Sequence, residues 1–218
     1  MLWRQGARDF VDLRIPADLP DMGGAASLAE LDAAALSALA RCEGFAGTTE
    51  VEDGVCVWTR EINFRGPQTG PDVGALEMAA EGLIETGVHA DYSELWTLAE
   101  AGPVETRTLR DAAGRLLVLA AGPEGFSLGR ADPAAASGTA LADALAAALA
   151  ANDRPALRAL FAQEFCCGAF DGDVARIDAS TDPTRIGVAA FLRGDLGRAA
   201  PRLVEKGFDG AERATLWF

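Results

Sequence analysis

A β-hairpin pattern between residues 45 and 64 constrains the fold of this chain more than any other feature. In the segments FAGTTEV and VCVWTREINF the polarity of the side chains has a period of two residues, which is the period of a β-strand. Glu-Asp-Gly separates them, and an Asp-Gly pair favours the tight turn of an antiparallel hairpin. Similar segments occur at residues 8–15, 75–80, 83–85, 92–99, 104–109, 116–120, 125–129, 165–170, 174–179 and 187–192, and in the final ERATLWF. Short strands joined by tight turns predict a mainly β protein, an antiparallel barrel or sandwich.

Two helical excursions interrupt these strands. In the first, residues 27–41, Ser27 and Glu30 form a capping-box pattern ahead of an apolar stripe. The second, residues 133–164, is rich in alanine and has leucines four residues apart. Alanine is weakly apolar and Asp143 interrupts the run, so no membrane span is expected there.

The helical segments divide the chain into three predicted parts. Residues 1–132 form an N-terminal β-barrel unit, with the 27–41 helix as a lid over its mouth. Residues 133–164 are the helical excursion. Residues 165–218 supply strands that either close the same barrel or form a second small unit. No internal repeat is evident in the sequence.

The charge balance excludes several classes of partner. The 218 residues include 33 acidic and 19 basic side chains, a formal net charge of -14. Such a chain repels phosphate backbones and anionic lipid, so neither nucleic acid nor a membrane is an expected partner. The segment MLWRQGARDFVDLRIP has no apolar run after a basic start, and we expect a cytoplasmic protein. A small molecule is the expected partner, and no oligomeric state is predicted.

The cysteines and the single histidine give no metal or catalytic motif. Cys42, Cys56, Cys166 and Cys167 lack CxxC spacing, and we expect them to be reduced and packed. His89 is expected to be a turn residue. The alternatives are an axial haem ligand or the base of a catalytic triad, but no GxSxG serine accompanies it. No cofactor and no catalytic residue are predicted.

Three predicted strands combine aromatic and ionisable side chains on one face. The residues that alternation places on these faces are Phe10, Asp12, Arg14, Trp58, Arg60, Tyr92, Glu94 and Trp96. If the faces converge, they form a pocket with apolar walls and a few polar groups, as a small-molecule site requires. The alternative is that Val11, Leu13 and Ile15 face the core, which would leave the charged side chains in solvent as weak cross-strand pairs.

Arg60 is the residue of this set with the most specific prediction. Alternation places it on one face with Cys56, Trp58, Ile62 and Phe64, and such an apolar face is not expected to meet water. The guanidinium is therefore predicted to point into the barrel beside Trp58 and to pair with Glu94 or Asp12. Asp72, in the loop RGPQTGPDVG, is expected to be a turn residue.

Four segments together carry a resemblance: DFVDLRIP, EGFAGTTEVEDGVCVWTREINF, HADYSELW and EFCCGAFDGDVARIDASTDP. They span most of the chain and resemble a group of lipocalin-like proteins with a calycin-type barrel, related to the yeast kinase-interacting two-barrel proteins. The resemblance implies an antiparallel lipocalin-like β-barrel or two related barrel units, with no established activity. The chain departs from the group at Ala175, where an aromatic side chain would be expected.

The expected function is that of a small-ligand binding or carrier-type protein. One alternative is a protein-interaction module with a filled barrel. Another is a barrel lyase or isomerase in which Glu94 or Asp12 acts as general base.

Overall fold

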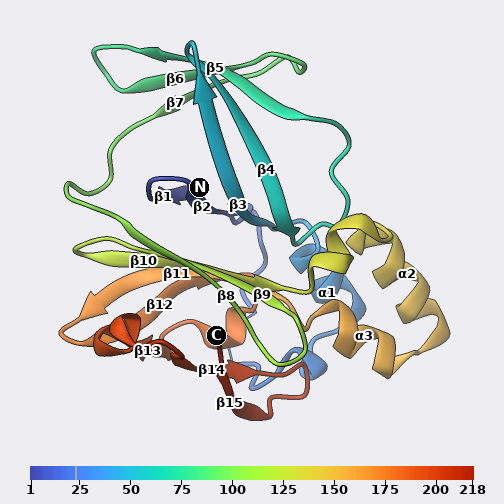
Figure 1. The fold of residues 1–218 in the computed structure, drawn as a ribbon. Helices are drawn as coiled ribbons and strands as arrows, with labels where there is room; N and C mark the ends of the chain where they lie inside the picture. Colours follow the sequence, from blue (N-terminus) through green and yellow to red (C-terminus); the bar gives the residue numbers. More distant parts are fainter. Residues whose placement is uncertain (23) are drawn as a thin grey trace.

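The computed structural model describes residues 1–22 and 24–218, and its 43% strand and 19% helix confirm a mainly β protein. Within these residues the strands form antiparallel sheets of seven and six strands and a separate two-stranded hairpin. Both larger sheets are curled, so each is a half-barrel (Figure 1).

The N-terminal sheet follows the order of the chain. Its strands are β1 (Leu2–Gln5), β2 (Asp9–Arg14), β3 (Glu43–Glu52), β4 (Val55–Asn63), β5 (Asp72–Met78), β6 (Leu83–Gly87) and β7 (Ser93–Trp96). The 3-10 helix η1 (Leu28–Glu30) and the helix α1 (Ala33–Leu39) lie between β2 and β3.

The C-terminal sheet also pairs its strands in chain order. They are β8 (Glu105–Arg110), β9 (Leu116–Ala121), β10 (Gly125–Ala131), β11 (Glu164–Asp171), β12 (Val174–Ser180) and β13 (Ala189–Leu192). Between β10 and β11 come η2 (Pro133–Ser137), α2 (Leu141–Ala151) and α3 (Arg154–Leu160). The chain continues through η3 (Pro183–Arg185), η4 (Arg193–Gly197) and the hairpin of β14 (Arg202–Lys206) and β15 (Glu212–Leu216).

The helix predicted over residues 27–41 is in fact two short elements. Leu31 adopts an extended conformation after η1, and Asp32 then caps α1 by accepting a hydrogen bond of 2.8 Å from the backbone N of Ala35. Ser27 and Glu30 do contact each other, with Ser27 Oγ 3.3 Å from Glu30 Oε1, but they precede η1 only. A second strong cap residue inside the segment therefore restarts the helix.

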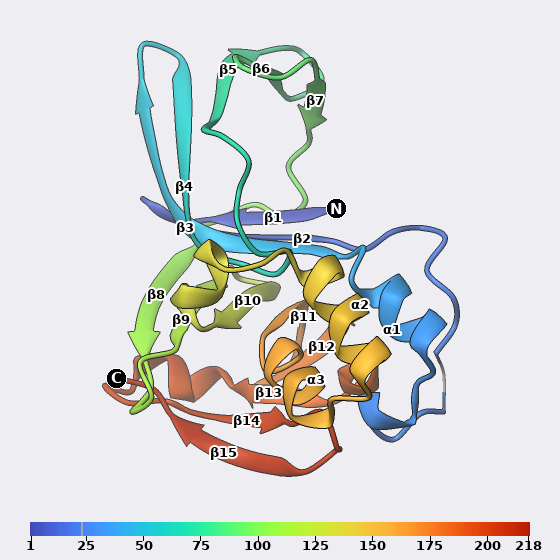
Figure 2. The ribbon, with the colours of Figure 1, turned by 90° about the vertical axis from the view of Figure 1, so that its right-hand side faces the viewer.

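The main core lies between the two sheets. Val11 of β2 packs in one apolar cluster with Val118 of β9 and Phe165 of β11, and the buried leucines of α1 and α2 join it. Figure 2 shows the three α-helices gathered on one side of the space between the sheets. Within the described part of the chain, no helix is long and apolar enough to cross a membrane.

Each sheet also carries an apolar cluster on the face that turns away from the other sheet. Phe10, Phe45 and Trp58 form it on the N-terminal sheet. On the C-terminal sheet it includes Leu117 and Leu119, and it is covered by the β14–β15 hairpin with the fully buried Trp217. Both faces of β9 and β10 are buried for this reason, as in the interior of a layered fold.

The two sheets share a plan that the sequence does not reveal. In each sheet an antiparallel strand pair, β1–β2 or β9–β10, comes directly before a helical excursion, and a hairpin follows it whose register shifts opposite a glycine, Gly47 in β3 and Gly168 in β11. A Cβ on Gly47 would lie 1.9 Å from the carbonyl oxygen of Thr59, and one on Gly168 would lie 1.8 Å from that of Arg176. Only glycine allows this close approach at a β-bulge.

The bulge opposite Gly47 corrects the predicted face of β4. Ala46 pairs with Ile62 but Gly47 pairs with Arg60, so one extra residue shifts the alternation. As a result, Ile62 and Phe64 belong to the core between the sheets, whereas Cys56 and Trp58 belong to the opposite cluster. The sequence had predicted one common face for all of them.

Candidate ligand-binding site

Two adjoining cavities lie inside the curl of the N-terminal sheet. The smaller has a volume of about 270 Å³ and is lined by Trp3, Arg14, Phe45, Trp58, Arg60, Asp72, Glu85, Tyr92 and Glu94. The larger, of about 690 Å³, shares Trp3, Trp58 and Glu85 with it. The rest of its wall is mostly apolar and comes from the N-terminal residue, from every strand of the sheet except β2, and from the segment after β7. The pair of cavities is therefore polar at one end and apolar at the other.

Arg14 joins two distant strands of the sheet. Its Nε donates to Asp12 Oδ2 at 2.9 Å within β2, and its Nη1 donates to Glu94 Oε1 of β7, also at 2.9 Å. Since β2 and β7 are five places apart in the strand order, this contact spans the curl. The ion pairs thus close one side of the smaller cavity.

Arg60 points into the same cavity as Trp58, but the predicted partner was wrong. Its Nε donates to Asp72 Oδ2 at 2.8 Å, and its Cζ lies 3.5 Å from the centroid of the Phe45 ring. Asp72 is the first residue of β5 and pairs with Trp58 across the ladder, so it is not a turn residue. The loop composition Pro-Gln-Thr-Gly-Pro hid the start of that strand.

Of the eight predicted pocket residues, six line a cavity: Arg14, Trp58, Arg60, Tyr92, Glu94 and Trp96. Phe10 and Asp12 border neither cavity and lie behind the residues that do. Phe10 stacks on Trp3 with ring centroids 4.6 Å apart, and Asp12 bonds Arg14. The charged faces therefore do converge, and the opposite face of β2, with Val11 and Leu13, is buried as well.

Trp3 is an important wall residue that the sequence did not single out. It sits on β1, and its ring lies edge-on to Trp58 and Trp96 at centroid distances of 5.8 and 5.4 Å. The strand LWRQ is too short to show a period, so the available signal was only a tryptophan next to charged and polar residues.

Glu85 is a second site residue that sequence analysis missed, and it borders both cavities. Its carboxylate accepts hydrogen bonds from Tyr92 Oη at 2.6 Å and from Trp96 Nε1 at 2.9 Å. Burial raises the pKa of Glu85, although these two hydrogen bonds act in the opposite direction. Gly74 makes room for the group, because a Cβ there would lie 2.8 Å from Glu85 Cγ and 3.0 Å from the Trp58 ring.

Two buried polar atoms of β2 and β4 lack a protein partner within the described chain. Asp12 is fully buried, and its Oδ1 accepts no hydrogen bond. The indole Nε1 of Trp58 donates none. Burial raises the pKa of Asp12 to about 6 and outweighs the opposing effect of Arg14. Such groups are uncommon in folded proteins, where buried polar atoms are nearly always bonded.

Other residues considered as functional lie elsewhere. His89 is exposed in the connection after β6 and borders neither cavity. Residues 27–41 also border neither, and their leucines pack in the core between the sheets. All four cysteines are buried and free. Residues 1–22 and 24–218 contain no cluster of side chains suited to hold a metal ion.

Comparisons with protein-family models, with curated proteins and with solved structures found no match to this chain. The relation to lipocalin-like barrel proteins stays a prediction.

Proposed function

We propose that this protein binds a small molecule inside its N-terminal half-barrel, as a lipocalin-like carrier. The observation that carries the proposal is the pair of adjoining cavities, which is polar beside Arg14, Arg60 and Glu94 and apolar at the other end. The larger cavity, of about 690 Å³, is in the size range of known small-molecule sites and is mostly apolar as they are, and the adjoining cavity of about 270 Å³ supplies polar groups.

The contrast between the two sheets supports a ligand rather than a filled interaction module. In the C-terminal sheet, the face turned away from the partner sheet is packed with Leu203 and Trp217, both buried. In the N-terminal sheet, the corresponding face is hollow. The lyase or isomerase alternative gains no support, because Asp12 and Glu94 both bond Arg14 and neither is a free base.

The test uses N-phenyl-1-naphthylamine, a neutral fluorescent probe of apolar cavities. We expect one probe molecule to bind per chain. Leu76→Trp, which fills the larger cavity, is expected to abolish binding. Val204→Trp on β14, which adds the same side chain at an exposed site, should have no effect. No binding to the wild-type protein, or equal binding to the Leu76→Trp protein, would refute the proposal.

A further inference from the structure

The geometry points to an amphipathic organic cation as the ligand of the N-terminal half-barrel. Its ammonium group lies at Glu85, and its apolar part occupies the larger cavity. This inference rests on the proposed small-molecule binding and adds the chemical class of the ligand.

Glu85 lacks the cation that a buried carboxylate needs. The residue is 6% exposed, and its two hydrogen-bond donors, Tyr92 and Trp96, are both neutral. It belongs to none of the ion pairs found in the described part of the chain. Buried charges are normally paired, so the free lone pairs of Glu85 are a binding position for a positive group.

The arginines of the two cavities are already occupied and are not free to bind an anion. Arg14 pairs with Asp12 and Glu94, and Arg60 pairs with Asp72. Arg4, which borders the larger cavity, pairs with Glu100. An anionic ligand would have to displace a carboxylate from one of these pairs, and it would then lie beside the displaced charge.

The aromatic rings around Glu85 also favour a cation. Trp3, Trp58 and Tyr92 border the smaller cavity together with Glu85, and Trp96 borders the larger one. The faces of indole and phenol rings attract ammonium groups, most strongly where water is excluded. Beyond the rings the wall becomes apolar, with Leu76, Leu83 and Leu95, and this end suits a hydrocarbon body.

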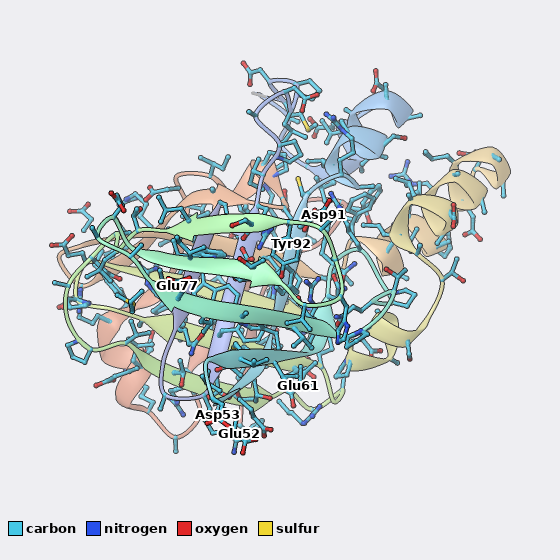
Figure 3. The ribbon with its side chains drawn as sticks, turned by 90° about the horizontal axis from the view of Figure 1, so that it is seen from above. Glu52, Asp53, Glu61, Glu77, Asp91 and Tyr92 are labelled. Atoms are coloured by element: carbon cyan, nitrogen blue, oxygen red, sulfur yellow. The ribbon has the colours of Figure 1, made fainter. Side chains whose placement is uncertain are left out.

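The surface of the N-terminal sheet is negatively charged, which also favours a cationic ligand. Residues 43–96 contain eleven aspartates and glutamates, two arginines and no lysine. Five of these acids are labelled in Figure 3 and are exposed: Glu52, Asp53, Glu61, Glu77 and Asp91. A negative field of this kind raises the local concentration of cations and repels anions on their way to the cavities.

The experiment compares three probes with the same ten-carbon chain and different head groups: decylamine, decanol and decanoate. Titration calorimetry at pH 7, below micelle-forming concentrations, measures the affinity of each for the wild-type protein. We expect decylamine to bind about tenfold or more tightly than decanol, with decanoate weakest, because a charge-assisted hydrogen bond adds about that factor. Added salt should weaken the binding of decylamine but not of decanol.

A matched pair of variants locates the positive group. Glu85→Gln is expected to lower the affinity for decylamine about tenfold and leave decanol binding unchanged. Glu77→Gln removes the same charge from the exposed side of the neighbouring strand and should change neither.

Other outcomes overturn the inference in distinct ways. Equal losses in the two variants would assign the preference to the surface field rather than to Glu85. Decanoate binding as tightly as decylamine in the wild-type protein would refute the cationic ligand without any need for a variant. In that case binding of the neutral naphthylamine would still support the proposed function, whereas failure of every probe would refute both.

Discussion

Asp12 is fully buried, and its pKa of about 6 is above that of an aspartate in an unfolded chain. The folded protein therefore holds the proton more tightly, so the stabilising effect of protonation is complete below about pH 4 and is lost as the pH rises through 6. We expect Asp12→Asn to raise the free energy of unfolding by about 1–3 kcal/mol at pH 7 and to have little effect at pH 4. Urea denaturation at both pH values measures it. A loss of stability at pH 7 would mean that the ion pair with Arg14 outweighs burial.

Arg60 and Asp72 form a partly buried pair, with side chains 20% and 17% exposed. We expect Arg60→Met to lower the free energy of unfolding by about 1–3 kcal/mol, less than for a fully buried pair, because water partly solvates the remaining carboxylate. Adding Asp72→Asn should recover part of the loss. Adding Glu94→Gln instead should recover none, since that carboxylate belongs to Arg14. Recovery by Glu94→Gln would contradict the observed pairing.

At the scale of elements, the bulge between β3 and β4 decides which side chains of β4 reach the cavity. A methyl group on Gly47 would collide with the backbone of Thr59, which cannot move without breaking the ladder. We expect Gly47→Ala to cost about 2–3 kcal/mol of stability, as for other overpacked sites. Gly194→Ala is the control, because its Cβ would meet nothing within 4 Å. Thermal denaturation of the two variants compares them, and similar midpoints would show that the bulge relaxes.

The sequence predicted individual strands better than their faces. Alternation identified the β3–β4 hairpin and the aromatic and charged side chains of β2, β4 and β7, because these signals are local. It failed where one residue changes the phase, as at the bulge opposite Gly47, and where turn residues begin a strand, as at Asp72. Trp3 and Glu85 were missed for another reason: their roles depend on rings and strands far away in the chain.

At the scale of the whole molecule, the β14–β15 hairpin gives the C-terminal sheet a filled second core. Trp217 is fully buried there, whereas Trp96 lies half-buried at the edge of a cavity. We expect Trp217→Ala to cost about 3–5 kcal/mol and Trp96→Ala clearly less, because the second truncation enlarges a space that is already open. Guanidinium denaturation gives both values. A larger loss for Trp96→Ala would contradict the assignment of the N-terminal sheet as the hollow one.

The arrangement of two half-barrels was beyond the reach of sequence patterns. Strand order depends on contacts between distant segments, and the continuous burial of β9 suits several layered folds equally well. The two sheets share an architecture, but few residues at corresponding positions are identical. Arg14 lies opposite Glu43 in the β2–β3 ladder, as Arg130 lies opposite Glu164 in the β10–β11 ladder, but the other residues of these strands differ. Only the coordinates reveal the correspondence.

The proposed ligand would fill the hollow face of the N-terminal sheet as the β14–β15 hairpin fills the corresponding face of the C-terminal sheet. The hairpin that packs one sheet is part of the chain, whereas the proposed ligand of the other would bind reversibly. A ligand that binds only the folded state stabilises it by an amount that rises with the logarithm of the ligand concentration, so the lifetime of the protein in the cell would increase with the abundance of the proposed ligand. The empty carrier would be the form that proteases remove first.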